Sequence, residues 1–478
     1  MGLCTDGRGK AAVLLSMLAL AGCATASQVG KLVLAGDSRS LRDRVEGSPA
    51  RSSEGDPILV LALDGVDRAL LYDLLREGEL PGFAALLGGS KRAFPHAHFS
   101  DELLTTLPSS TMAGWSTMFT GVTPAHHGVT GNEFFIRETR TLGAPAPVTF
   151  HEAGPTIACF TGDEYCNRLL HAPTVYERMR ERDPDVLVWV AMQHIYAGAD
   201  LLLLADRTAF ARAFEDELEA VVVKVTEGRE TRGVYESLDR EVVEVVLEEL
   251  DSDDAVVPDV LTVYLSGTDL YGHVAAEGPD VARREYLKEV ADQEVGKLAR
   301  VLTERGELAQ RWVIVTSDHG HTEVLHDDTH SLSADGDDEP PAVLDKVGFR
   351  LRPFALQVDE SHDFQAVFTA GGAMAYVYLA DRSRCQTPGA PCPWQDPPRF
   401  EEDVLVAAEA FHAANTNGEH VPQLKGTIDM ILTRRPRPYV EIDAPFEVYA
   451  GDGKLVPIPE WLGAHPHPPY VALDARRR

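Results

Sequence analysis

Four short segments of the chain carry side chains whose types could hold metal ions around a hydroxyl group. Carboxylates and imidazoles are ligands for divalent metal ions, and a threonine hydroxyl becomes a nucleophile when it loses its proton. Three of the segments follow, directly or closely, an apolar run typical of a buried strand. Because α/β proteins bind ligands at the carboxyl ends of their strands, we expect these side chains to converge on one sheet edge. The segments are Leu63-Asp64-Gly65, Ser110-Thr111-Met112, Gly267-Thr268-Asp269-Leu270-Tyr271-Gly272-His273 and Ser317-Asp318-His319-Gly320.

Taken singly, two of these segments also have an ordinary structural interpretation. Asp64 ends a strand, a position where aspartate most often caps the following helix. Thr111 precedes a stretch that indicates a helix ending at Gly121, so its hydroxyl could be a simple N-cap. The functional alternative is that unpaired backbone N–H groups at this helix start favour a bound phosphate and the alkoxide that attacks it.

The other two segments pair a carboxylate with an imidazole. Asp269 and His273 lie one helical turn apart, or on one loop, so both can reach the same ion; the alternative is a surface loop. Asp318 and His319 are adjacent at a strand end, where their side chains diverge, which suits two neighbouring ions or one ion plus a substrate. A buried aspartate beside a buried histidine is costly unless the two are paired or bind a metal.

The strands and helices that must position these segments follow from the hydrophobic pattern. Continuous apolar runs are typical of central parallel strands that helices cover on both faces. Helical patterns follow the first and third runs, with leucines from Leu70 to Leu75 and apolar residues from Tyr286 to Leu302. The alternation predicts a doubly wound α/β sheet, mostly parallel and flanked by helices. The runs are Ile58–Leu63, Val186–Val190, Val260–Leu265 and Trp312–Thr316.

The charge of the chain restricts its partners. Among 478 residues, 44 Lys and Arg face 75 Asp and Glu, which gives a formal net charge of −31. Such a surface repels nucleic acid and anionic membrane, so we expect neither as a partner through general electrostatics. A small anionic substrate then needs a local positive focus, which metal ions can supply.

The N-terminal sequence has the features of an export signal. Two basic residues precede the apolar stretch Ala11–Ala21, which is too short to span a bilayer. The stretch ends in Leu20-Ala21-Gly22-Cys23, which resembles a bacterial lipoprotein signal. We therefore expect cleavage before Cys23, acylation of that cysteine and an extracytoplasmic, membrane-anchored protein. The alternative is an ordinary secretory signal in which Cys23 stands by chance.

Four further cysteines form two pairs with the same offset of seven residues. In an oxidising compartment two local disulfides are the natural prediction, Cys159–Cys166 and Cys385–Cys392, although three connectivities or four free thiols are formally open. Both pairs lie in Pro-containing, weakly periodic stretches, residues 140–180 and 381–400, which we interpret as insertions near the site. The predicted organisation is a signal peptide (1–22), a lipidated tether (23–55), a catalytic α/β domain (56–433) and a C-terminal segment (434–478).

The four segments occur in the order Asp, Thr, Asp-x-x-x-His and Asp-His. This order and its strand context resemble the alkaline phosphatase superfamily, most closely its type I phosphodiesterase/nucleotide pyrophosphatase branch. The strongest stretch runs from Thr120 to Asn132 and is similar to that branch's T-G-x-x-P-x-x-H-G-x-x-x-N signature. The resemblance covers roughly residues 56–325. It implies an alkaline-phosphatase-like fold.

The resemblance also implies a role for each matching residue. Thr111 would be the nucleophile, and Asn132 would hydrogen-bond a phosphoryl oxygen. Asp64, Asp318 and His319 would hold one metal ion together with the threonine. The remaining pair, Asp269 and His273, would hold the second metal ion.

The family's ions are usually zinc, and imidazole and carboxylate ligands suit zinc, with manganese as the alternative. Two divalent ions against three aspartates leave about one positive charge in the pocket. The expected reaction is hydrolysis of a small phosphate ester through a phospho-threonine intermediate. One ion would lower the pKa of the threonine, and the other would neutralise the leaving oxygen.

Two departures from the family pattern concern the site. The branch often has F-P-N-H after the nucleophile, where this chain has Met112-Ala113-Gly114-Trp115. The family takes a third ligand for the second metal from a C-terminal His-Gly motif, and none follows His319-Gly320. The candidates for that ligand are His465, His467 and His330, with His326 and His420 as weaker ones.

Several functions on this scaffold remain open at this stage. The leading hypothesis is a phosphodiesterase of the nucleotide pyrophosphatase type, with a phosphomonoesterase or another phospho- or sulfo-ester transferase as alternatives. Sulfatases need C/S-x-P-x-R at the nucleophile, and the residues from Ser110 to Gly114 lack both the proline and the arginine. A hypothesis of another class is a non-catalytic binding lipoprotein with a degenerate second metal site.

Overall fold

The computed structural model describes most of the chain between residues 38 and 465. The predicted signal peptide, Cys23, His326, His330 and His467 lie outside the described residues, which are 38–42, 55–90, 92–147, 154–160, 164–205, 232–252, 257–322, 336–358, 362–435 and 446–465. In this part of the chain, no helix combines the length and the apolar composition needed to cross a bilayer.

The core of the molecule is a six-stranded sheet in the order β1-β6-β5-β7-β2-β8. All neighbours pair in parallel except β1, which lies antiparallel to β6. The four apolar runs all form strands of this sheet, so the predicted α/β fold is confirmed. The strands are β1 (Arg39–Ser40), β2 (Ile58–Leu63), β5 (Val188–Ala191), β6 (Leu201–Leu203), β7 (Val260–Leu265) and β8 (Trp312–Ser317).

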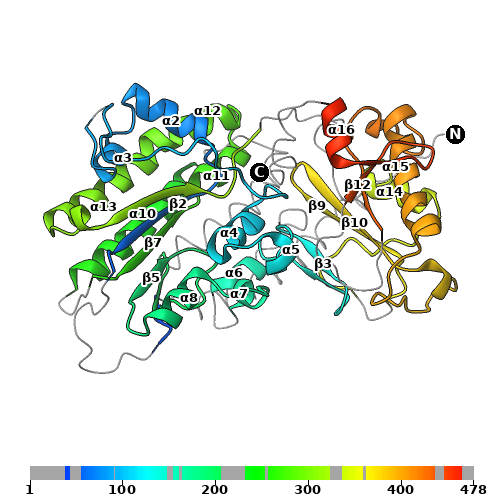
Figure 1. The fold of residues 1–478 in the computed structure, drawn as a ribbon, viewed down its shortest axis with the longest axis horizontal. Helices are drawn as coiled ribbons and strands as arrows, with labels where there is room; N and C mark the ends of the chain where they lie inside the picture. The colour runs from blue at the N-terminus through cyan, green and yellow to red at the C-terminus, as the bar shows by residue number, and fades with distance from the viewer. Residues whose placement is uncertain are drawn as a thin grey trace, which may run out of the picture.

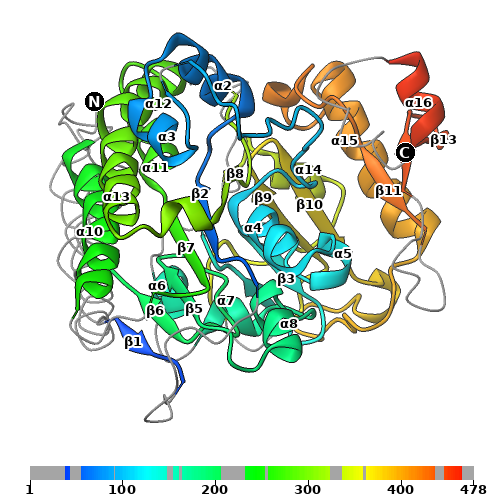
Figure 2. The same cartoon turned by 60° about the vertical axis from the view of Figure 1, so that its left-hand side comes forward.

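Helices cover both faces of this sheet, as the connections between parallel strands require. One layer contains α2, α3 and the helices from α10 to α13, and the other contains α4 to α8 (Figures 1 and 2). The first layer is α2 (Arg68–Glu77), α3 (Pro81–Leu86), α10 (Arg232–Asp251), α11 (Gly267–Val274), α12 (Pro279–Tyr286) and α13 (Asp292–Glu304). The second layer is α4 (Thr111–Thr120), α5 (Pro124–His127), α6 (Gly154–Phe160), α7 (Tyr165–Arg168) and α8 (Val175–Arg182).

The helical pattern predicted from Tyr286 to Leu302 differs in one detail. A π-helical turn, Leu287–Ala291, joins α12 to α13, so the pattern spans two helices and the turn between them. The apolar side chains still reach the core, because Leu287, Leu298 and Leu302 are fully buried. Periodicity therefore predicted the buried face but not the irregular turn.

A second group of elements lies beside the main sheet, on the right in Figure 1. It has its own apolar clusters, one of which packs Phe135 of the β3–β4 hairpin against Phe364 and Trp394. Its elements are β9 (Ala366–Gly371), β10 (Met374–Leu379), β11 (Leu432–Arg434), β12 (Phe446–Tyr449), β13 (Leu455–Pro457), α14 (Pro340–Lys346), α15 (Leu405–Asn417) and α16 (Ile458–Ala464); the hairpin is β3 (Phe134–Ile136) and β4 (Thr141–Gly143).

Both predicted disulfides are present in the structure. Cys159–Cys166 ties α6 to α7, and Cys385–Cys392 closes a loop in the second group of elements. All four cysteines are at most 2% exposed. The two stretches that the sequence marks as weakly periodic are thus each held by a local covalent link.

Candidate metal centre and active site

Three adjacent strands bring the first set of functional side chains together. β2 lies between β7 and β8, and its last residue, Leu63, pairs in register with Leu265 on one side and Ser317 on the other. The next residues, Asp64 and Asp318, therefore leave the sheet side by side at its carboxyl edge. α11 begins at the same level after β7, so the ligand-bearing turns share one edge.

Asp64 is 3% exposed and has one satisfied and one unsatisfied oxygen. Its Oδ2 accepts a hydrogen bond from the hydroxyl of Tyr264, whereas Oδ1 has no hydrogen-bond partner within the described residues. Burial, together with the nearby carboxylates of Asp318 and Asp269, raises the pKa of Asp64 well above its usual value. A positive charge close to the carboxylate is needed to keep such a group ionised.

His319 points one nitrogen at the centre of this group. Its Nδ1 lies 2.9 Å from the carbonyl oxygen of Gly320, which fixes a proton there and leaves Nε2 with its lone pair. Nε2 lies 3.1 Å from Thr111 Oγ1, 3.4 Å from Asp318 Oδ2 and 3.5 Å from Asp64 Oδ1. Asp318 Oδ2, like Asp64 Oδ1, is buried without a hydrogen bond in the described structure.

Thr111 is the first residue of α4, directly after the N-cap residue Ser110. Its hydroxyl does not cap the helix but lies beside His319, so the alternative of a simple N-cap is not what the structure has. Asn132, from the signature stretch, accepts the backbone N–H of Met112 through Oδ1 at 2.9 Å. This bond anchors the start of the helix and leaves the amide NH2 of Asn132 as a donor.

The departure from F-P-N-H after Thr111 has a steric consequence. A Cβ atom at Gly114 would lie 2.8 Å from the Cβ of Asp318 and 3.0 Å from its carbonyl oxygen. The glycine therefore lets α4 approach the turn after β8 closely enough for Thr111 to reach His319. Residues with a side chain at this position would push the hydroxyl away from the histidine.

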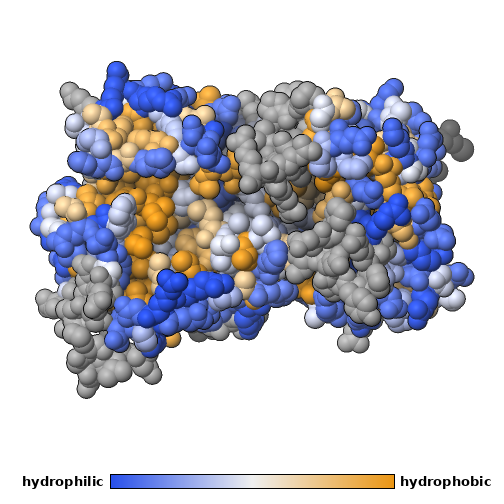
Figure 3. All heavy atoms as spheres, viewed as in Figure 1, coloured by the Kyte–Doolittle hydropathy of each residue, from blue (hydrophilic) through white to orange (hydrophobic). Residues whose placement is uncertain are grey.

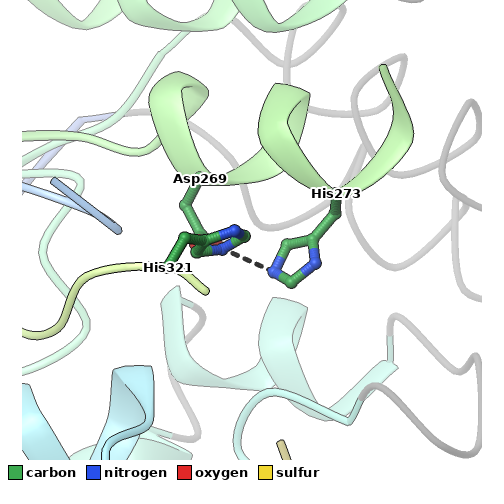
Figure 4. A group of neighbouring side chains, drawn as sticks. All are labelled: Asp269, His273 and His321. Atoms are coloured by element: carbon green, nitrogen blue, oxygen red, sulfur yellow. Dashed lines mark hydrogen bonds and ion pairs between the residues drawn. The ribbon is translucent and has the colours of Figure 1, made fainter. Parts of the chain in front are cut away.

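The second group consists of Asp269, His273 and His321, whose ligand atoms all lie within 4.8 Å of one another. Asp269 and His273 project from the same face of α11, and His321 comes from the segment after β8 (Figure 4). Asp269 Oδ1 lies 2.6 Å from His321 Nε2, and Oδ2 lies 3.2 Å from His273 Nε2. Burial opposes ionisation of Asp269, but His273 and His321 lower its pKa well below the usual value.

Both groups fit divalent cations on the chemistry of their donors. The first group contains the unpaired oxygens Asp64 Oδ1 and Asp318 Oδ2, and the second brings two imidazoles to the carboxylate of Asp269. A third possible group, Asp64, Asp269 and His319, links the two. Three aspartates at most 6% exposed would repel one another without a positive charge between them. Gly65 also permits this crowding, because a Cβ there would lie 2.4 Å from Asp269 Oδ1.

Asp239 holds the helix that carries two of these side chains. This carboxylate of α10 is fully buried and accepts the backbone N–H groups of Ser266 at 3.0 Å and Gly267 at 3.2 Å, at the start of α11. The hydroxyl of Tyr286 donates to it as well, at 3.1 Å. Burial raises the pKa of Asp239 to about 7, although these donors lower it in part.

Replacing Asp239 with alanine should weaken zinc binding by Asp269 and His273 by about 10- to 100-fold, because the start of α11 loses its acceptor. Competition against a chromophoric chelator would measure the dissociation constant. The matched control is Asp239→Asn, which keeps one acceptor oxygen for the two amides and should retain most of the affinity. Equal affinity in wild type and Asp239→Ala would show that this contact does not support the cluster.

A comparison with known protein families identifies the family of the chain. The family model described as type I phosphodiesterase / nucleotide pyrophosphatase matches residues 58–383, which is more than half of the chain. The chain belongs to this family. Strands β2, β7 and β8 and helix α4, which begins at Thr111, all lie inside the matched range.

Solved structures that resemble the chain include members of the phosphodiesterase group, at low identity. Murine ectonucleotide pyrophosphatase/phosphodiesterase 5, in an inactive form in complex with AMP, is 14% identical with a TM-score of 0.40, and covers 68% of this chain. The chain spans 66% of the length of that structure. Phosphonoacetate hydrolase from Sinorhizobium meliloti 1021, in complex with phosphonoformate, is 19% identical with a TM-score of 0.31 and coverages of 59% and 60%. No curated protein sequence matches the chain.

For a member of the type I phosphodiesterase family, the unexpected residue is His321. The family pattern predicts the third ligand of the second metal among later histidines, yet His321, two residues after His319, lies 2.6 Å from Asp269 Oδ1. Of those candidates, His465 instead stands in the second group of elements with Nδ1 2.9 Å from Trp461 O, and His420 pairs with Glu419. The sequence does contain a signal for His321, which is its spacing of two residues from His319. Residues i and i+2 of an extended segment point to the same side.

Replacing His321 with alanine should reduce the number of divalent ions that each chain can bind from about two to about one, with zinc as the ion tested. The imidazole is 2.6 Å from Asp269 Oδ1, so its loss leaves that cluster with two ligands in place of three. Elemental mass spectrometry of the purified protein would give the stoichiometry. His465→Ala is the control and should leave the zinc content unchanged; loss of zinc in that variant instead would transfer the role to the C-terminal histidine.

Proposed function

We propose that the protein is a metal-dependent hydrolase of small phosphate esters, a phosphodiesterase of the nucleotide pyrophosphatase type that uses Thr111 as its nucleophile. The observation that carries the proposal is the convergence of Thr111 Oγ1 and the unpaired oxygens of Asp64 and Asp318 on His319 Nε2. Membership of the phosphodiesterase family supports the same reaction class.

Each residue of the proposed site has its own role in this reaction. Two divalent ions, zinc first, would be held by Asp64, Asp318 and His319 and by Asp269, His273 and His321, and would act as Lewis acids toward the nucleophile and the leaving oxygen. The Thr111 hydroxyl loses its proton to solvent, its Oγ1 forms a bond to phosphorus as the bond to the leaving alkoxide breaks, and the alkoxide takes a proton from solvent. Water then attacks the phospho-threonine, releases the phosphate product and restores the hydroxyl.

The start of α4 positions the phosphate for this attack. The helix dipole favours negative charge at this end of the helix. Asn132 holds Met112 in place through Oδ1, and its amide NH2 donates to a phosphoryl oxygen. Because these donors are fixed before the substrate arrives, they cost little reorganisation during the reaction.

The test of this function is an assay on paired substrates. Zinc-loaded protein should hydrolyse a bis(nitrophenyl) phosphodiester faster than nitrophenyl phosphate, and chelation followed by zinc should remove and restore the activity. Faster turnover of the monoester would indicate a phosphomonoesterase. Two bound ions without turnover of either ester would favour the binding lipoprotein, and failure to bind zinc would overturn the proposal.

We also propose that the protein acts outside the cytoplasm, attached to a membrane through an acylated Cys23. The two disulfides support this location, because local disulfides persist in oxidising compartments. Metabolic labelling with a fatty acid should mark the wild type but not Cys23→Ala. Labelling of both proteins would exclude Cys23 as the acylated residue.

A further inference from the structure

A buried arginine of α12 lies next to the turn that follows Asp64. Arg283 is only 2% exposed, although hydrophilic residues line the outer edge of the molecule near α2 and α12, at the upper left of Figure 3. An arginine is seldom buried unless its charge is paired and its N–H groups are hydrogen-bonded. The partners of Arg283 therefore indicate what this buried charge does.

The guanidinium of this arginine binds the segment between Asp64 and helix α2. Its Nη1 donates to the carbonyl oxygen of Gly65 at 3.2 Å and to Asp67 Oδ2 at 3.1 Å. The other oxygen of Asp67, Oδ1, accepts the backbone N–H of Leu70 at 2.9 Å and so caps α2. The arginine thus fixes both the residue after a proposed metal ligand and the residue that begins the next helix.

The end of β8 binds the other side of the same turn. The backbone N–H of Gly65 donates to Asp318 Oδ1 at 3.3 Å, and that of Val66 donates to Ser317 Oγ at 3.1 Å. Asp318 Oδ1 is thereby occupied, which leaves Oδ2 as the unpaired oxygen that lies 3.4 Å from His319 Nε2. The turn is therefore held between Arg283 and a second proposed ligand.

The ion pair of Arg283 and Asp67 also packs against the two other segments that carry proposed ligands. A Cβ at Gly320, which separates the two histidines after β8, would lie 2.6 Å from Asp67 Cβ. A Cβ at Gly272, the residue before His273, would lie 3.2 Å from Arg283 Cγ. Neither glycine has a positive φ, so it is the close approach of the ion pair that leaves no room for a side chain.

We propose that Arg283, paired with Asp67, is a positioning residue that holds the two groups of proposed metal ligands at a fixed distance from each other. The pair contacts the turn after Asp64, which belongs to the first group, and also α11 and the segment after β8, which supply the second. Loss of the pair should therefore weaken the binding of both ions. This inference rests on the proposed function, because it concerns the same metal centre.

A zinc titration against a chromophoric chelator tests the proposal, with Asp67→Asn as the first variant. The asparagine keeps an oxygen for the cap of α2 but loses the charge that pairs with the guanidinium. Both zinc dissociation constants should rise by about 10-fold or more, as expected when a residue that orients metal ligands is changed. The matched control is Asp280→Asn. Asp280 pairs with the same guanidinium at 2.7 Å but lies on α12 itself with a side chain 64% exposed, so both constants should stay unchanged.

Arg283→Lys is the second variant and should also raise both dissociation constants. Lysine keeps the positive charge, but its single nitrogen cannot span the acceptors that the planar guanidinium binds together. In the double variant with Asp67→Asn, the increase should be smaller than the product of the two single effects, because both changes break one contact. Arg311→Lys is the control for this substitution. Arg311 is 9% exposed and donates to the carbonyl of Pro258 at 2.9 Å, at the amino end of β8, so both constants should stay unchanged.

The outcomes separate this inference from the proposed function. Unchanged constants in Asp67→Asn and Arg283→Lys would overturn the inference, and so would a rise in only one constant or an equal rise in Asp280→Asn. Two ions bound by a wild type that hydrolyses no ester would contradict the proposed function alone, since the constants still test the role of Arg283. Failure of the wild type to bind zinc would overturn both. Circular dichroism of each variant shows whether it is folded, and Asp67→Asn decides the proposal if Arg283→Lys is not.

Discussion

Thr111→Ala should lower the rate of phosphodiester hydrolysis by about 10⁴-fold or more. The hydroxyl is the only group at the start of α4 that lies within hydrogen-bond distance of His319 Nε2 in the described structure, at 3.1 Å. Without it, no hydroxyl of α4 lies beside His319 to form the covalent bond to phosphorus. Zinc content should change little, because the charged carboxylates and the imidazole remain. Initial rates and elemental analysis on the same samples would measure both quantities.

Two controls separate a lost nucleophile from a disturbed helix. Thr111→Ser keeps a hydroxyl and should retain measurable turnover. Ser110→Ala changes the preceding residue, whose buried Oγ has no hydrogen-bond partner in the described residues, and should leave the rate within a few-fold of wild type. Equal rates in Thr111→Ala and wild type would assign the nucleophile to another group.

Asp64→Asn should have opposite effects on activity and on the stability of the metal-free protein. Loss of a charged ligand of the proposed metal ion should reduce hydrolysis by about 10³-fold or more, because a Lewis acid at this place would lower the barrier by several kcal/mol. The metal-free variant should nevertheless be about 1–2 kcal/mol more stable to unfolding than the metal-free wild type. The asparagine removes one of the buried negative charges near Asp269 and Asp318, yet its oxygen can still accept from Tyr264.

Denaturant unfolding with and without zinc would test whether the metal-free variant gains stability while its activity falls. Zinc should stabilise the wild type strongly and the variant much less, because binding to the native state alone adds stability. Asp292→Asn is the matched control: Asp292 is also buried, at 5% exposed, but it accepts the amides of Gly82 and Phe83, away from the cluster. A metal-free Asp64→Asn less stable than the wild type would mean that the carboxylates do not repel one another.

These two predictions depend on residues that the sequence already singled out, and the reason is local. An apolar run such as Ile58–Leu63 or Val260–Leu265 buries its side chains on both faces only as a strand in a sheet that helices cover. The strands and the residues that end them therefore follow from the sequence alone. The disulfides are local in the same way, because cysteines seven residues apart close a short loop in each pair.

Only the tertiary structure decided which distant groups meet. His321 reaches Asp269 across 52 residues, and Tyr264 reaches Asp64 across 200, contacts that no periodicity encodes. In the sequence, Asp239 cannot be told apart from the other acidic residues of an amphipathic helix. Its role as an acceptor appears only where α10 packs against the start of α11.

Packing also decided where the hydroxyl of Thr111 lies. Its sequence context predicts a helix start, at which a hydroxyl can cap the helix or act on a ligand. Strand order and the glycine at position 114 bring His319 to the hydroxyl, and these depend on burial summed over the whole sheet. The sequence by itself therefore determined the strands and the chemical groups at their ends, while the fold decided which of those groups share a site.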